Sequence, residues 1–278
     1  MRAWNGCTWL TSTSDGGLAS APMDPILVER AGGVVTVTLN RPERLNAITN
    51  EMWPQLADIF AEVATRAEDR VLVVTGAGEA FCSGADISGE GPATGPPLLH
   101  MREVGNAALA LHRLPKPSIA RVDGVATGAG LNLALGCDLI VASDRSRFSE
   151  IFARRGLSVD FGGSWLLPRL VGMHRAKELV LLAEILSAEE AMAMGLVNRV
   201  VPAESLDAVV AEWTARLSEG PPLALSMSKL LLNKSLETSM DQALEAEAQA
   251  QAVNLAGADV REALAAFVEK RTPVFAGH

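Results

Sequence analysis

Tyrosine is absent from the 278-residue chain, which also has only three cysteines and four histidines. Cys7, Cys82 and Cys137 are too scattered to indicate a disulfide framework or a zinc ribbon. The histidines show no metal-ligand spacing either, so we expect no metal site. General acid–base chemistry would therefore fall to carboxylates, to backbone groups or to water.

Long apolar runs are also missing. No segment approaches the ~20 apolar residues of a membrane-spanning helix, and residues 1–23 lack the apolar core of a signal peptide. We expect this Ser-, Thr- and Gly-rich stretch to be a disordered leader, or to precede an original start at Met23. The expected location is the cytoplasm, with no membrane partner. A net charge of -9 argues against nucleic acid as a partner.

Several nucleotide and nucleophile motifs are absent as well. The turn at 128–130 lacks the third glycine of a dinucleotide site, and no Walker A sequence occurs. No Gly-x-Ser-x-Gly nucleophile elbow is present. These absences argue against a dinucleotide site, a P-loop and a serine nucleophile.

What the chain does contain is two turns of small residues, at 81–86 and 124–130. Each turn follows an apolar strand pattern and precedes a helical one. Turns built from glycine and alanine can expose backbone N–H groups, and two such donors aimed at one carbonyl oxygen form an oxyanion hole. Sites of this kind stabilise enolates and the intermediates of acyl chemistry.

Hydrophobic residues make up 49% of the chain and charged residues 21%, which indicates a globular protein. Strand patterns alternate with helical ones, so we predict an α/β core over 24–200 and a helical C-terminal region over 201–278. The expected strands lie at 26–29, 34–39, 71–75, 118–122, 139–142 and 198–201. The expected helices of the C-terminal region lie at 205–219, 221–236, 238–256 and 259–270.

Five motifs follow one another in the order of a known family. They are Leu-Asn-Arg-Pro at 39–42, Leu-Asn-Ala at 45–47, the two turns and the segment 156–163. With a similar tail at 267–275, the chain resembles the crotonase (enoyl-CoA hydratase/isomerase) superfamily over most of its length. The resemblance implies a spiral of ββα units, a helical C-terminal trimerisation region, and a homotrimer or dimer of trimers. It also implies an acyl-CoA thioester substrate, with no cofactor beyond the coenzyme A that the substrate carries.

By this resemblance, the N–H groups of Ala85 and Ala129 hold the thioester oxygen. Deprotonation beside a thioester creates an enolate, and two N–H donors stabilise that charge where it develops. The alternative is that both alanines only allow a helix to pack closely on a strand. Lys270 could meet a phosphate of coenzyme A or simply end a helix in solvent. The residues expected by resemblance to bind the coenzyme A body are Arg44, Leu45, Asp86, Ile87, Ser88, Gly128, Phe267 and Lys270.

Hydratases of the family use two glutamates to activate water, and this chain departs from both. The matching positions hold Phe152 and Asn132, whose amide cannot accept a proton near neutral pH. Glu150 lies two residues too far from Gly162, so we interpret it as a strand-end or surface carboxylate. The two-glutamate machinery is therefore expected to be missing. Phe152 and Trp165 would line an apolar acyl pocket, or belong to the core.

Asp160 is the carboxylate that the last motif contains. Segment 156–165 resembles a subgroup in which this aspartate moves protons in enoyl-CoA isomerisation, although Val159 replaces the usual proline. Between Val159 and Phe161, Asp160 is expected to be poorly solvated, with a raised pKa suited to a base. Its alternative role is an N-cap for the helix that begins at Gly162.

Three hypotheses follow for the function. The first is an enoyl-CoA isomerase in which Asp160 moves the proton and Asn132 orients substrate or water. The second is an enoyl-CoA hydratase that adds water with an unusual pair, Asp160 and Glu150. The third is a non-catalytic acyl-CoA binder that kept the pocket and lost the catalysis.

Overall fold

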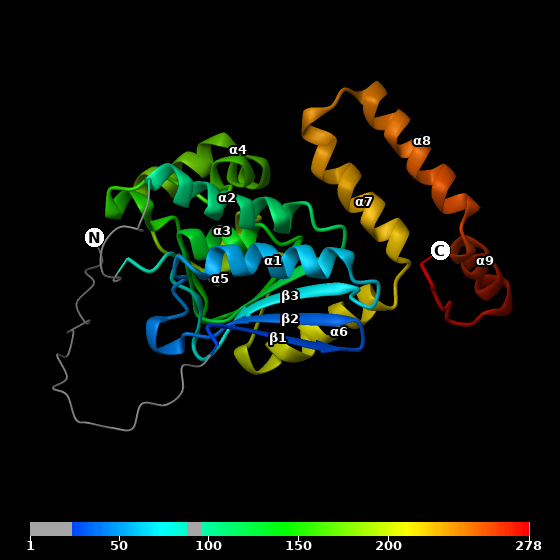
Figure 1. Ribbon diagram of the computed structural model, residues 1–278, viewed down its shortest axis with the longest axis horizontal. Helices are drawn as coiled ribbons and strands as arrows, with labels where there is room; N and C mark the ends of the chain where they lie inside the picture. Colours follow the sequence, from blue (N-terminus) through cyan, green and yellow to red (C-terminus); the bar gives the residue numbers. More distant parts are fainter. Residues whose placement is uncertain (1–23, 88–95, 278) are drawn as a thin grey trace.

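The strands form two sheets in the computed structural model, which describes residues 24–87 and 96–277 (Figure 1). The larger sheet has the strand order β1-β2-β3-β5-β7-β10, and the smaller sheet has the order β4-β6-β8-β9. The strands of the larger sheet are β1 Ile26–Ala31, β2 Val34–Leu39, β3 Val71–Gly76, β5 Ser118–Val122, β7 Leu139–Ser143 and β10 Arg199–Val201. Those of the smaller sheet are β4 Ala80–Cys82, β6 Val125–Thr127, β8 Arg147–Ser149 and β9 Leu186–Ser187.

Helices follow the strands in a repeating order. Each repeating unit contributes one strand to each sheet. The larger sheet contains β3, β5 and β7, and the smaller sheet contains the strands that follow them, β4, β6 and β8. Helices α2, α3 and α4 then close the three units, so the predicted spiral of ββα units is confirmed. The helices of the core are α1 Met52–Thr65, α2 Pro97–His112, α3 Ala129–Leu135, α4 Gly163–Leu182, α5 Ala188–Ala193 and α6 Leu206–Ser218. Short 3-10 helices are η1 Pro42–Arg44, η2 Ile151–Arg155, η3 Ala203–Ser205 and η4 Ser235–Glu237.

The larger sheet has helices on both faces, with α1 and α2 on one side and α6 on the other (Figure 1). Val73, Ile119 and Val141, from three neighbouring strands, pack with Leu206 and Val210 of α6. Because both faces are covered, β3 is a nearly continuous apolar run, as parallel strands with two buried faces usually are. This rigid sheet carries the turns that follow its strands.

Every strand of the larger sheet begins and ends within two residues of its predicted range. The strands of the smaller sheet are absent from the sequence-based prediction. They have two or three residues each, which is too short to show an alternating pattern. β4 and β6 also overlap the small-residue turns, and their glycine-rich surroundings favour the prediction of a turn over that of a strand.

Three helices extend from the core as an arm: α7 Pro222–Lys234, α8 Met240–Ala256 and α9 Ala258–Glu269 (Figure 1). With α6, they match the four helices predicted for the C-terminal region. Lys229 Nζ of α7 meets the core in an ion pair with Asp138 Oδ2 at 2.7 Å. α6 belongs to the predicted C-terminal region but packs on the sheet of the core. The boundary predicted at residue 200 between the core and the C-terminal region therefore stays a prediction. Within the two described ranges, no helix has both the length and the apolar character needed to cross a membrane.

Candidate active site

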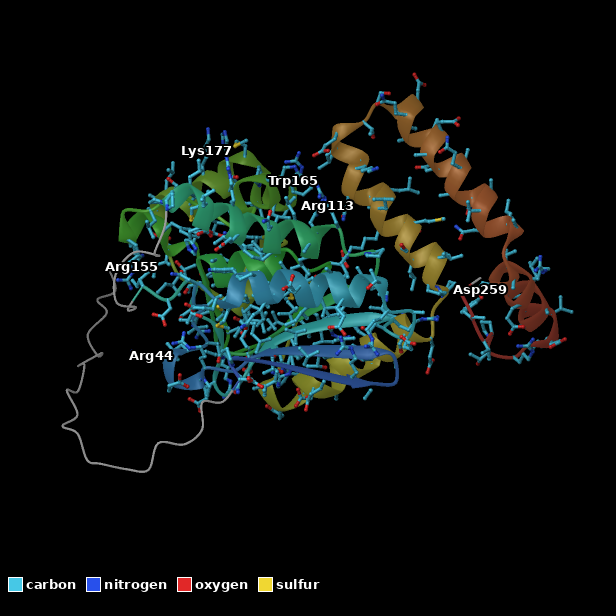
Figure 2. The ribbon with its side chains drawn as sticks, viewed as in Figure 1. Arg44, Arg113, Arg155, Trp165, Lys177 and Asp259 are labelled. Carbon is cyan, nitrogen blue, oxygen red and sulfur yellow. The ribbon has the colours of Figure 1, made fainter. Side chains whose placement is uncertain are left out.

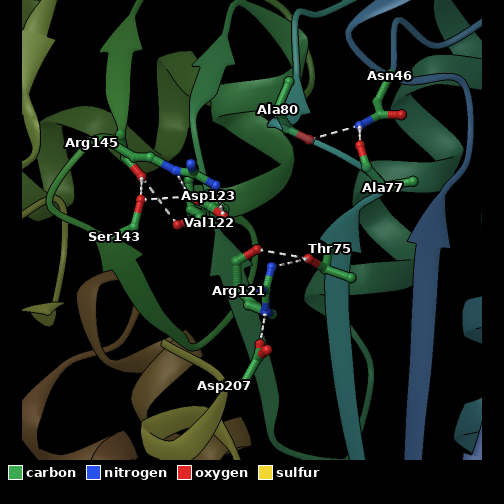
Figure 3. Close-up of polar contacts among 11 residues, drawn as sticks. Asn46, Thr75, Ala77, Ala80, Arg121, Val122, Asp123, Ser143, Arg145 and Asp207 are labelled. Carbon is green, nitrogen blue, oxygen red and sulfur yellow. Dashed lines mark hydrogen bonds and ion pairs between the residues drawn. The ribbon is translucent and has the colours of Figure 1, made fainter. Parts of the chain in front are cut away.

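The first small-residue turn is held by the buried side chain of Asn46 (Figure 3). Its Nδ2 donates to the carbonyl oxygens of Ala77 and Ala80, at 2.8 and 2.7 Å. A parallel bridge between Ile48 and Ala85 ties the far end of the turn to the segment before α1. The backbone around Ala85 is therefore anchored on both sides.

The second turn begins at Asp123, which is fixed by a basic partner (Figure 3). Arg145 donates to both oxygens of the Asp123 carboxylate at 2.6 and 2.7 Å, and Ser143 Oγ donates to Oδ1 at 2.7 Å. Hydrogen bonds from Arg145 hold the pKa of Asp123 below its usual value. Asp123 is thus an ionised residue that fixes the start of the turn.

Glycines allow the two turns to approach each other closely. A Cβ on Gly130 would overlap Cys82, lying against its carbonyl oxygen and 2.8 Å from its Sγ. A Cβ on Gly84 would lie 3.6 Å from the backbone nitrogen of Ala129. The end of β4 and the start of α3 are therefore in direct contact, and side chains would separate them.

Two backbone N–H groups are open where these turns meet. Ala129 is the first residue of α3, so its N–H has no acceptor within the helix. Among the described residues, no backbone carbonyl accepts from the Ala85 N–H either. Adjacent, unpaired N–H groups on a fixed backbone are what an oxyanion hole requires. Close packing, the alternative considered for these alanines, occurs here together with open donors.

A buried polar cluster lies on the first turn of α3. Asn132 is fully buried, and its Nδ2 donates to the backbone oxygen of Asp160 at 3.0 Å and to Glu150 Oε2 at 3.4 Å. A Cβ on Gly163 would lie 2.5 Å from the Asn132 amide, so the first residue of α4 packs directly on that amide. Asn132 therefore joins three segments, from α3, from the end of β8 and from the start of α4.

Asp160 is held in this cluster by a strained turn. Phe161 has φ 46° and Gly162 has φ 81°, both in the left-handed region that most residues avoid. The Phe161 ring is buried against Trp53 of α1, with 5.5 Å between ring centroids, and this packing stabilises the turn. Burial raises the pKa of Asp160 to about 6, as the sequence predicted in direction. The alternative N-cap role is wrong, because α4 starts at Gly163 with no side-chain cap.

The burial of Glu150 contradicts a second expectation from the sequence. The sequence indicated a strand-end or surface carboxylate, and Glu150 does follow β8, but its side chain is fully buried. The pKa of Glu150 is raised to about 8, mainly by burial and in smaller part by the charge of Asp160, while the Asn132 hydrogen bond opposes the rise. The sequence offered no signal for this burial, because β8 has three residues and its parallel pairing with β6 emerges only in the folded chain.

The family model for enoyl-CoA hydratase/isomerase matches residues 29–278. The chain belongs to this family. It is 39% identical to the 1,2-epoxyphenylacetyl-CoA isomerase of Escherichia coli, over 92% of this chain and 99% of that protein. It is 34% identical to the short-chain-enoyl-CoA hydratase of Clostridium acetobutylicum, over 90% and 96%. The crystal structure of an enoyl-CoA hydratase from Mycobacterium smegmatis superposes with a TM-score of 0.86 at 34% identity, covering 91% of this chain and 99% of that one.

The protein is thus an enzyme of the crotonase superfamily that acts on acyl-CoA thioesters. Several of the residues predicted to bind coenzyme A lie at the first turn. Arg44 and Leu45 are adjacent to this turn, which donates a backbone hydrogen bond to Leu45 O at 3.0 Å. Asp86 forms an ion pair with Arg41 at 2.8 Å, next to the exposed side chain of Ile87. Arg41 was missed by the sequence reasoning, although the motif at 39–42 contains it.

The two predicted acyl-pocket residues have different neighbours. Phe152 is buried beside the second turn, since a Cβ on Gly128 would be 3.6 Å from its ring. Trp165 faces the arm (Figure 2): its indole N–H donates to Glu237 Oε1 at 3.1 Å, and its ring meets His112 at 5.0 Å between centroids. A role in the acyl pocket stays a prediction for both aromatic side chains.

Two predicted coenzyme A residues, Phe267 and Lys270, are distant from the turns within one chain. Phe267 and Lys270 lie at the exposed end of α9, at the far end of the arm (Figure 1). Lys270 is the C-cap of this helix, with φ 55°. Ser88 lies outside the described residues. For these three residues, binding of coenzyme A stays a prediction.

Proposed function

We propose that the protein is an enoyl-CoA isomerase that shifts a carbon–carbon double bond in an enoyl-CoA thioester. The observation that carries this proposal is the half-buried Asp160 carboxyl, whose Oδ1 is buried without a partner among the described residues, in the cluster that packs on the first turn of α3. A single base is sufficient to move a proton between two carbons. The name of the Escherichia coli relative, an isomerase, is in line with this choice.

In the proposed reaction, the ionised Asp160 removes a proton from the carbon next to the thioester of a 3-enoyl-CoA. The electron pair of the broken C–H bond enters a dienolate, and negative charge develops on the thioester oxygen. The N–H groups of Ala85 and Ala129 donate to that oxygen, and removal of one such donor typically costs ~10²–10³ in rate. Asp160 then returns the proton to the far end of the dienolate, which restores the carbonyl and gives the 2-enoyl-CoA.

Asn132 supports this chemistry by holding the backbone of Asp160 and by contacting Glu150. Gly128 leads the chain into the second donor, with φ 55°. The coenzyme A body would lie along Arg44, Leu45 and the residues from Asp86 to Ser88, with Phe267 and Lys270 supplied by a second copy of the chain or by movement of the arm. The chemistry needs no cofactor beyond the coenzyme A of the substrate, and the proposed assembly is a homotrimer or a dimer of trimers.

Hydration of a 2-enoyl-CoA is the second candidate, because Glu150 lies in the same buried cluster as Asp160. The name of the Clostridium acetobutylicum relative, a hydratase, is in line with it. Addition of water favours one base and one acid at the water, and this pair could supply both. The third candidate, a non-catalytic binder of acyl-CoA, would keep the turns without using Asp160.

Incubation of the protein with 3-enoyl-CoA and with 2-enoyl-CoA separates the three candidates. An isomerase raises the absorbance of the conjugated thioester from the 3-enoyl substrate without a change of mass. A hydratase adds the mass of water to the 2-enoyl substrate. Water addition that persists in Asp160→Asn would overturn the isomerase proposal, and binding without any turnover would favour the non-catalytic alternative.

A further inference from the structure

The cluster around Asn132 is short of hydrogen-bond donors. Asn132 Oδ1, Glu150 Oε1 and Asp160 Oδ1 are buried, and none of these atoms has a hydrogen-bond partner among the described residues. Among the described residues, the donor that hydrogen-bonds within the cluster is Asn132 Nδ2, and it is already used by Glu150 Oε2 and by the backbone oxygen of Asp160. Buried acceptors without donors are costly, so a further proton in the cluster would stabilise it.

Strand register places Glu150 beside the proposed oxyanion hole. β6 and β8 are parallel, with Thr127 opposite Ser149. The residues that follow these two strands, Gly128 and Glu150, are therefore next to each other in register. The Gly128 N–H donates to Ser149 O at 2.9 Å, which extends the pairing to the residue before Ala129. A charge on Glu150 would therefore lie close to the place where the enolate becomes negative.

We infer that Glu150 is a positioning residue of the active site, which carries its proton in the working enzyme and leaves Asp160 as the single ionised base. This inference rests on the proposed isomerase function. A protonated Glu150 supplies the missing donor of the cluster and holds the Asn132 amide, which in turn holds the backbone of Asp160. It also keeps a second negative charge away from the enolate.

The electrostatics of the cluster favour this arrangement. Burial raises the pKa of Asp160 to about 6 and that of Glu150 to about 8, so Asp160 ionises first as the pH rises. The groups that face Glu150 are the neutral amide of Asn132, from α3, and the carboxyl of Asp160, from the turn before α4. Among the described residues, no Arg, Lys or His acts on Glu150 to stabilise its charge and lower its pKa.

The pH dependence of kcat/KM tests this inference. We expect wild-type kcat/KM for 3-enoyl-CoA to rise through pH 6 as Asp160 ionises, and to fall through pH 8 as Glu150 loses its proton. Glu150→Gln keeps a neutral donor and acceptor in place at every pH, so its profile should rise through pH 6 as in wild type while the alkaline fall disappears. Glu204→Gln, at an exposed position, is the matched control and should keep the wild-type profile.

An alkaline fall that survives in Glu150→Gln would overturn the inference. Circular dichroism checks that the variant is folded. If it is not, the wild-type protein still provides a test by infrared spectroscopy, without any reaction. The C=O stretch of a protonated carboxyl should be present at neutral pH and should disappear as the pH passes 8.

The infrared measurement also separates failure of this inference from failure of the proposed function. Asp160→Asn should keep the protonated-carboxyl band at neutral pH, because burial is the largest cause of the raised pKa of Glu150. A band with no turnover of any enoyl-CoA would show that Glu150 is protonated as inferred and that the isomerase proposal is wrong. Turnover of 3-enoyl-CoA with no band at neutral pH would overturn the inference and leave the isomerase proposal standing.

Discussion

Asp160 has a half-buried carboxyl, and hydrogen bonds from other residues hold its backbone in place. Asp160→Asn keeps the shape of the side chain and removes the base, so we expect kcat/KM for 3-enoyl-CoA to fall by ~10²–10⁴. Binding of acyl-CoA should change little, because the turns of Ala85 and Ala129 are untouched. Steady-state kinetics and calorimetric titration measure the two effects. Asp144→Asn, at an exposed position, is the control, and equal losses in both variants would contradict the role of Asp160.

Glu150 makes stability depend on pH in a direction opposite to that of a paired carboxylate. Its folded-state pKa of about 8 lies above its ordinary value of 4.5, so between these values the folded chain binds more protons than the unfolded chain. The free energy of unfolding contributed by this group is then fully present below 4.5 and is lost as the pH rises toward 8. Urea unfolding across this range should show a steeper loss of stability in wild type than in Glu150→Gln. Parallel curves would show that Glu150 is ionised in the folded protein.

The amino-acid types at the site were easier to predict from the sequence than their surroundings. Ala85, Ala129 and Asp160 lie in motifs with a fixed order, and the pKa of Asp160 is raised as its apolar neighbours indicated. Glu150 was misread because its burial depends on Asn132 from α3 and on the turn before α4, which approach it only in the folded chain. Local sequence carries no record of such contacts.

At the scale of elements, the small-residue turns work because strand β4 and helix α3 touch. Gly130→Ala would place a methyl group against Cys82, so we expect a loss of ~1–3 kcal/mol in the free energy of unfolding, together with loss of activity as Ala129 shifts. Gly105→Ala is the matched control in α2, where the added Cβ meets nothing within 4 Å. It should raise stability by up to ~1 kcal/mol, since alanine is the better helix former. Urea unfolding of both variants measures the contrast, and equal effects would contradict it.

The elements of the larger sheet were predictable, whereas the smaller sheet was not. β3 and β7 are apolar runs bounded by polar or glycine residues, and such runs indicate buried strands. β6 and β8 have three residues each and pair in parallel only because the larger sheet brings their ends together. The site is built on these short strands, so its geometry follows from the tertiary structure more than from local pattern.

At the scale of the whole molecule, the arm exposes more apolar surface than a monomer normally leaves in water. Leu232, Leu244, Leu255 and Phe267 are each at least half exposed, and α8 buries no residue. Exposed apolar surface of this extent usually marks a site of association. A second copy of the chain would cover it, in agreement with the trimer that we propose.

Charged residues on α8 should therefore weaken self-association. We expect the purified wild-type protein to sediment with a mass well above 29.3 kDa, as an oligomer of the single chain. The double variant Leu244→Glu/Leu255→Glu places carboxylates in the apolar surface, so its mass should shift toward that of the monomer. Gln251→Glu is the control, because it adds a charge at an exposed polar position of the same helix. If the arm helps to bind coenzyme A across the interface, the double variant should also raise KM for acyl-CoA, and Gln251→Glu should leave KM unchanged. Sedimentation of the wild-type protein as a monomer would contradict both the oligomer and this effect on KM.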